Sequence, residues 1–151
     1  MIISNEAQLR ALILRSSQAA IKAAEERIYA VIKKTLVQYY SEFEPDEYIR
    51  TLQLLHSLVK TQVISTGNGF EAKVYFDADM LNYQKGVIPT QHGTGYATWG
   101  ADEVLDTAMN GSHGGYISGT AVWGTSMAVL GDICNLIVQE LIKQGIPVVK
   151  G

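Results

Sequence analysis

The sequence has little cysteine, little proline and no long apolar run. Cys134 is the only cysteine among 151 residues, so an intramolecular disulfide bond is impossible and synthesis in a reducing cytoplasm is expected. No apolar run approaches the roughly 18 residues that a membrane-spanning helix needs, so we expect no membrane partner. The start of the chain lacks a basic segment followed by an apolar one, which predicts that no secretory signal is present.

The sequence also lacks the ligand spacing of a metal site and the motifs of a cofactor site. The three histidines are far apart, and no pair has the spacing of a zinc finger or of a zinc protease. Asp77 and Asp79 lack the other ligands of a calcium loop. Cys134 falls on the apolar side of an expected helix, so we interpret it as a buried structural residue. We therefore expect no metal, no cofactor and no small-molecule substrate.

One short match suggests catalysis, and we reject it. The segment Gly124-Thr125-Ser126-Met127-Ala128 matches the surroundings of the nucleophile in subtilisin-like serine proteases. His92 and the upstream Asp77 or Asp79 even stand in the order of that family's catalytic triad. However, only 34 residues separate His92 from Ser126, too few for the large parallel α/β sheet of that fold. We predict that the chain is not an enzyme.

The residues that are present predict an α+β fold in a single domain, residues 1–151. Hydrophobic residues make up 47% and charged residues 18% of the chain, which is typical of a folded domain. Residues 4–41 contain neither Gly nor Pro and are rich in strong helix formers, which predicts a helix about 55 Å long. A domain of this size has a radius of gyration of about 15 Å. Part of the helix in residues 1–41 is therefore expected to project from a body formed by residues 42–151.

The expected helix has two different sides. Residues at helical spacing from Ile13 to Tyr39 form an apolar side, and Arg15, Lys22 and Lys33 fall on the opposite side. Residues 1–34 hold six basic and three acidic residues (+3), whereas the rest of the chain holds six basic and twelve acidic residues (−6). This division indicates either two differently solvated faces or a basic end that meets the acidic body of the next subunit. Because nucleic-acid binders are usually more basic, such binding is expected to be at most incidental.

The body is expected to contain a small antiparallel sheet, long Gly-rich loops and a packed C-terminal helix. The expected segments are a helix that begins at Pro45, a hairpin in 61–76, an irregular stretch in 77–102, a short helix in 102–109, a Gly-rich stretch in 111–124 and a closing helix in 127–143. The Gly-rich stretches carry Tyr96, Trp99, Tyr116 and Trp123. They are either surface loops or contact surfaces, since Tyr and Trp supply large contact area at low entropic cost.

A resemblance to a known family enters through two groups of residues. Tyr40, Pro45, Tyr48, Arg50-Thr51 and Leu54-Leu55 resemble a Tyr…Pro…Tyr-x-Arg-Thr…Leu signature. The later Val104-Leu105-Asp106, Gly111-Ser112-His113-Gly114-Gly115 and Trp123 resemble the second half of the same kind of protein. Over residues 40–147 the chain resembles minor structural proteins of tailed bacteriophages, in the family that includes neck and tail-completion proteins of lambda-like siphophages.

The resemblance implies a structural role without catalysis. It implies an α+β subunit that closes a ring between portal and tail, in contact with itself and with neighbouring connector, portal-side or tail proteins. The expected location is the neck of the virion, after synthesis in the bacterial host. Arg50 is then a bidentate partner for a carboxylate and Tyr48 a packing anchor, unless both serve only the subunit's own fold. The alternative is a phage or prophage protein that is not packaged and binds a host protein.

Overall fold

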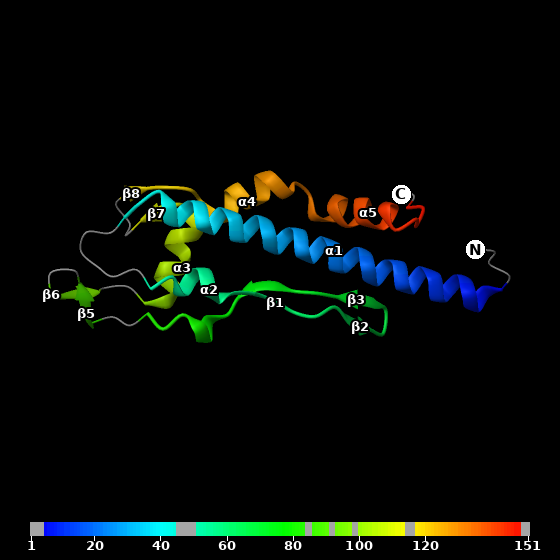
Figure 1. Ribbon diagram of the computed structural model, residues 1–151, viewed down its shortest axis with the longest axis horizontal. Helices are drawn as coiled ribbons and strands as arrows, with labels where there is room; N and C mark the ends of the chain where they lie inside the picture. The colour runs from blue at the N-terminus through cyan, green and yellow to red at the C-terminus, as the bar shows by residue number, and fades with distance from the viewer. Residues whose placement is uncertain are drawn as a thin grey trace. The chain divides into compact units, whose positions relative to one another are not determined.

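The computed structural model describes residues 5–44, 51–83, 86–90, 93–97, 100–113 and 117–148. Helices and short antiparallel ladders follow one another along the chain (Figure 1), which confirms the predicted α+β class. The contacts divide the chain into two units. Unit 1 comprises residues 1–29, 60–74 and 130–151, and unit 2 comprises residues 30–59 and 75–129. Each unit is described by itself below.

The longest element is α1 (Glu6–Ser41), which confirms the predicted N-terminal helix. Asn5 caps it, because its side-chain Oδ1 accepts a hydrogen bond of 2.9 Å from the backbone N–H of Gln8. An uninterrupted run of good helix formers without Gly or Pro explains why the helix continues through 36 residues. The residues up to Tyr29 belong to unit 1, and those from Ala30 onward belong to unit 2.

The buried side of α1 largely follows the predicted period. Ala20 and Ala24 are buried in unit 1, and Thr35 and Tyr39 are buried in unit 2. Ile13, which was predicted on the same side, is instead 44% exposed. The apolar residues in the first turns of α1 have helical spacing, but no described part of the molecule covers them.

Unit 1 contains the predicted hairpin. Strands β2 (Ile64–Thr66) and β3 (Gly69–Glu71) pair antiparallel around the two-residue turn Gly67-Asn68. The predicted second strand does not continue to residue 76 as part of this hairpin. Instead β4 (Val74–Phe76) pairs with β1 (Leu58–Lys60), which precedes the hairpin.

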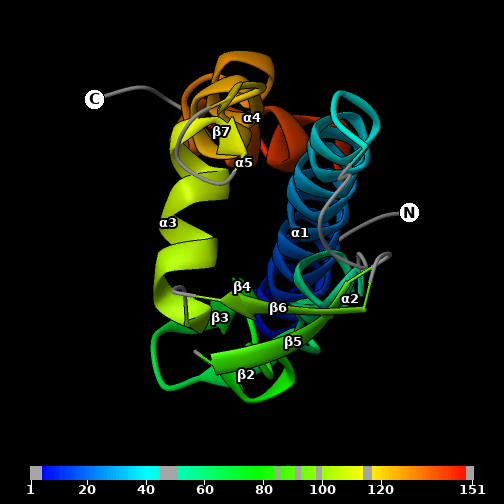
Figure 2. The same ribbon diagram turned by 90° about the vertical axis from the view of Figure 1, so that its left-hand side faces the viewer.

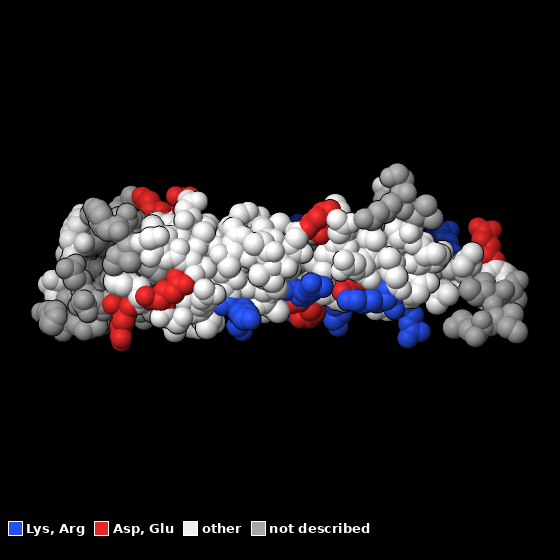
Figure 3. All heavy atoms as spheres, turned by 90° about the horizontal axis from the view of Figure 1, so that it is seen from above, with Lys and Arg blue, Asp and Glu red and all other residues white. Residues whose placement is uncertain are grey.

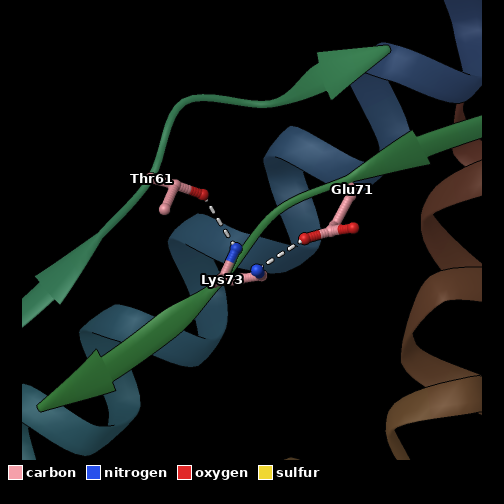
Figure 4. A network of polar contacts seen from close by, with 3 residues as sticks. All are labelled: Thr61, Glu71 and Lys73. Carbon is pink, nitrogen blue, oxygen red and sulfur yellow. Dashed lines mark hydrogen bonds and ion pairs between the residues drawn. The ribbon is translucent and has the colours of Figure 1, made fainter. Parts of the chain in front are cut away.

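A small polar network joins the two chain segments that flank the hairpin (Figure 4). The backbone N–H of Lys73 donates to Oγ1 of Thr61, and the backbone N–H of Thr61 donates to the carbonyl of Lys73, both at 2.9 Å. The Lys73 ammonium also lies 2.9 Å from a carboxylate oxygen of Glu71. These contacts satisfy the backbone where the regular ladder of β2 and β3 stops.

Unit 2 begins with the end of α1 and continues through α2 (Gln53–Ser57). Within the described residues α2 begins at Gln53 and not near Pro45, and residues 45–50 lie outside them. Leu52 precedes α2 with a φ of 58°, a left-handed conformation in which no helix propagates. The short 3₁₀ helix η1 (Ala78–Met80) follows β4, and Asp77 caps it by accepting the N–H of Asp79 at 3.1 Å.

The prediction of an irregular stretch in residues 77–102 was wrong. Strands β5 (Gly86–Thr90) and β6 (Gly93–Ala97) form an antiparallel hairpin of five residue pairs. The three glycines and one proline within these strands hide the alternation by which a strand is recognised in sequence. The backbone pairs along this hairpin although its side chains show no alternating pattern.

Helix α3 (Ala101–Asn110) confirms the predicted short helix, and Gly111 ends it with a φ of 79°. Strand β7 (Ser112–His113) follows at once, at the end of α3 (Figure 2), and pairs with β8 (Ile117–Ser118). The hydroxyl of the buried Tyr39 donates to the carbonyl of Ser112 at 2.8 Å. This bond ties the last part of α1 to β7 within unit 2.

The predicted closing helix is two helices, α4 (Val122–Leu130) and α5 (Ile133–Lys143). Gly131 breaks the helix with a φ of 68°, and the Asp132 carboxylate accepts the backbone N–H of Cys134 at 2.9 Å as the cap of α5. The break turns the helical face, so Cys134 is exposed and the prediction of a buried cysteine was wrong. Leu136 and Glu140 are buried in α5 instead.

Candidate functional site

The first turns of α1 form the most unusual surface of unit 1. Every residue from Asn5 to Arg15 is exposed. This N-terminal segment carries four large apolar side chains that are 37–47% exposed. They are Leu9, Leu12, Ile13 and Leu14. Four large apolar side chains within six residues of exposed helix are an unusual concentration, which makes this segment a candidate contact surface.

The predicted basic side of α1 is exposed as well. Arg15, Lys22 and Lys33 are all exposed. They are seven and eleven residues apart, and at 100° per residue they fall within about 20° of one another on the helix surface. On the face drawn in Figure 3, basic side chains follow one another along α1 with acidic side chains between them. The three side chains form a charged stripe along one side of the helix.

The hairpin of β5 and β6 presents a second apolar surface. Val87 and Tyr96 are directly opposite one another in the ladder and are 76% and 73% exposed. Their side chains therefore stand together on one face of the hairpin. The structure confirms the exposure of Tyr96, whereas Val87 was missed because no strand was predicted there.

Helix α4 presents the third apolar surface. Trp123 is 56% and Val129 61% exposed, and the neighbouring Gly124 and Ala128 are exposed too. The exposed Trp123 was predicted as a contact residue. Of the remaining predicted contact residues, Tyr48, Arg50, Trp99 and Tyr116 lie outside the described residues.

Helix α3 carries an acidic surface. Asp102, Glu103, Asp106 and Thr107 line a shallow surface depression on its exposed side. Two of these acids also serve the helix itself. A carboxylate oxygen of Glu103 accepts the N–H of Gly100, and Asp106 accepts the side-chain amide of Asn110, each at 2.9 Å. This acidic face of α3 (Asp102, Glu103 and Asp106) belongs to unit 2.

A buried carboxylate lies on α1 in unit 1. Glu25 is only 5% exposed, and its Oε1 has no hydrogen-bond partner among the described residues. Burial raises the pKa of Glu25, against the lowering effect of Lys60 and, more weakly, Lys22, while Glu26 raises it further. The Lys60 ammonium forms an ion pair with Glu26 and lies 5.4 Å from the centre of the Tyr29 ring.

The described structure includes Ser126 and Asp77, two of the residues that matched a protease triad. Ser126 is 1% exposed within α4, and in the part of the chain that the structure describes its hydroxyl has no hydrogen-bond partner. Asp77 caps η1, as described above, and His92 lies outside the described residues. Among the described residues, no three His, Cys, Asp or Glu side chains are grouped so that they would hold a metal ion.

Comparisons with known proteins do not assign a function to this chain. No protein-family model matches the chain, and no curated protein or solved structure is significantly similar to it. Within the described residues no single helix has the length and hydropathy of a membrane span. Helices α4 and α5 taken together do, but the chain bends at the break between them. One such pair is weak evidence for a span, because core helices of folded proteins also have this length and hydropathy.

Proposed function

We propose that this chain is a structural subunit of the head–tail connector of a tailed bacteriophage, a neck or tail-completion ring. It acts through protein–protein contacts with copies of itself and with neighbouring connector, portal-side or tail proteins. The proposal combines the resemblance over residues 40–147 with one structural observation. That observation is the exposure of the apolar first turns of α1, which a protein partner would cover.

The other surfaces agree with an assembly role. Tyr96 and Trp123 are the kind of exposed aromatic residue that forms the centre of protein interfaces. They lie on different elements, β6 and α4. A subunit within a ring needs several contact surfaces, because it meets copies of itself and other proteins at once.

The test is electron microscopy of particles from a phage whose copy of this gene is disrupted. We expect filled heads and finished tails that lie apart, and joined particles after expression of the wild-type chain from a plasmid. Normal infectious particles without the protein, or its absence from purified virions, would contradict the proposal. Normal particles together with capture of a host protein by the purified chain would favour the unpackaged host-binding protein.

A pair of variants links this test to the structure. Complementation with a double variant that combines Leu9→Ser and Ile13→Ser is expected to lower the yield of infectious particles at least about tenfold. Both side chains are exposed and available for contacts. Complementation with Glu6→Gln, which alters the same segment without removing an apolar side chain, is the matched control. Equal yields from both would exclude the side of α1 that carries Leu9 and Ile13 as a contact surface.

A further inference from the structure

We propose that the N-terminal segment of α1 in one copy docks on the acidic face of α3 in a second copy. This inference rests on the proposed function and names the contact by which copies of the chain join one another. The contact is heterologous, because it uses a different surface on each copy. Such a contact propagates from copy to copy and closes into a ring when the rotation allows it.

The first reason is charge. Unit 1 holds eight basic and six acidic residues (+2), whereas unit 2 holds four basic and nine acidic residues (−5). The segment contributes the exposed Arg10 and Arg15 to unit 1. The acidic face contributes Asp102, Glu103 and Asp106 to unit 2, all of them exposed. Opposite charges on two exposed helical surfaces of the same chain make a second copy the complementary partner.

The second reason is the arrangement of the side chains on α1. At 100° per residue, Leu14 falls between Arg10 and Arg15 on the helix surface. Leu14 is 47% exposed, so this side presents an apolar centre flanked by two guanidinium groups. Apolar centres with charged rims are the usual composition of specific interfaces. Leu9 falls on the other side of the helix, which gives the contact a matched internal control.

The third reason is length. The segment of residues 5–15 and the ten residues of α3 are each about 15 Å long at 1.5 Å per residue. Arg10 and Arg15 are about 7.5 Å apart along their helix, and Asp102 and Asp106 are about 6 Å apart along theirs. Two helices of this length placed side by side bring both arginines to the acidic face together. Each arginine then lies within reach of a carboxylate, the kind of group that guanidinium groups bind most strongly.

Sedimentation velocity of the full chain over a range of concentrations and salt tests the contact. We expect self-association that weakens as the ionic strength rises. Two double variants are each expected to raise the dissociation constant at least about tenfold. One combines Arg10→Glu with Arg15→Glu, and the other combines Asp102→Arg with Asp106→Arg. A mixture of the two reversed chains, or one chain with all four changes, is expected to restore association. Lys34→Glu, an exposed reversal outside the segment, is the charge control.

The apolar centre has its own test. Leu14→Ser is expected to weaken association, whereas Leu9→Ser is expected to leave it unchanged, although the two side chains are 47% and 44% exposed. Circular dichroism verifies that each variant keeps the helical content of the wild type. A chain that stays monomeric at low salt, or one whose association neither charge-reversed pair changes, would overturn the contact. Either result would leave the proposed connector function untouched. The virion experiment tests that function, whichever surface joins the copies.

Discussion

At the residue scale, Gly111 is the position where the fold depends most on a missing side chain. It ends α3 with a φ of 79°, and a Cβ atom there would lie 2.6 Å from the backbone nitrogen of Ala121. It would also lie 2.7 Å from the carbonyl oxygen of Gly119, whose own N–H donates to the carbonyl of Gly111 at 2.8 Å. Two separate constraints, conformation and space, therefore require glycine at this point.

We predict that Gly111→Ala lowers the free energy of unfolding by more than about 2 kcal/mol, since backbone atoms must move in addition to the cost of the left-handed conformation. Gly145 is the matched control, because it has a φ of 80° but nothing within 4 Å of an added Cβ. Gly145→Ala is expected to cost only about 1–2 kcal/mol. Urea unfolding of both variants measures the difference, and equal losses would show that the close contact at Gly111 is not important.

The buried Glu25 gives a prediction about pH. Because its pKa is raised in the folded chain, the folded state binds the proton more tightly than the unfolded state does. Stability is therefore expected to rise as the pH falls from neutral through the raised pKa, and this gain is complete below the ordinary carboxyl pKa. Glu25→Gln is expected to increase stability at neutral pH and to remove this part of the pH dependence.

Urea unfolding at several pH values provides the measurement for Glu25. Glu6→Gln is the control for the loss of one carboxylate from α1, because Glu6 is exposed at the start of the helix. If Glu25→Gln shows the wild-type profile, the carboxylate of Glu25 is not destabilised by burial. The sequence did not predict this group, because a glutamate in a helix of mixed charge gives no sign of burial.

At the element scale, the hydrogen bond from Tyr39 to Ser112 connects two elements that are distant in sequence. Its donor is a buried hydroxyl and its acceptor the first carbonyl of β7, 2.8 Å away. Tyr39→Phe is expected to lower the free energy of unfolding by about 1 kcal/mol, because the carbonyl loses its partner. Tyr75→Phe, at a side chain that is 46% exposed, is expected to change stability little. Thermal unfolding compares them, and equal shifts would show that the bond contributes nothing specific.

The break between α4 and α5 depends on the cap at Asp132. Its carboxylate accepts the N–H of Cys134 and the side-chain amide of Asn135, both at 2.9 Å. Asp132→Ala is expected to cost about 1 kcal/mol of stability, whereas Asp132→Asn keeps an oxygen acceptor and is expected to cost much less. Chemical unfolding separates the two variants. A loss of the same size in both would mean that the negative charge matters and that the hydrogen bond does not.

The same break shows how far sequence patterns predict elements. Helices with a sustained period, α1 and α3, were predicted within a few residues of their observed ends. The closing helix was predicted as one, because Met127, Leu130 and Cys134 continue a helical period across Gly131. A single glycine followed by a capping aspartate interrupts the backbone without disturbing that pattern. The hairpin of β5 and β6 was missed for the opposite reason, since its glycines remove the pattern while the backbone pairs.

At the scale of the whole molecule, the charge division predicted from residues 1–34 also appears in the two units. The basic excess remains with unit 1 and the acidic excess with unit 2. The exposed apolar side chains were predicted only in part. Tyr96 and Trp123 were predicted because they are aromatic, whereas Leu9, Leu12 and Leu14 were assigned to no surface because a leucine in a helix usually faces a core. Exposure depends on which elements cover a helix, and a local pattern does not contain that information.

The single exposed cysteine makes the chain suitable for optical counting. Cys134 is the only thiol in the sequence, and it lies at the start of α5 in a rigidly capped turn. A maleimide dye would therefore attach once per copy, without any substitution in the protein. The number of bleaching steps of one labelled particle would then equal the number of copies within it. The same thiol would link copies through oxidation wherever two such turns meet, so purification under reducing conditions keeps the count unbiased.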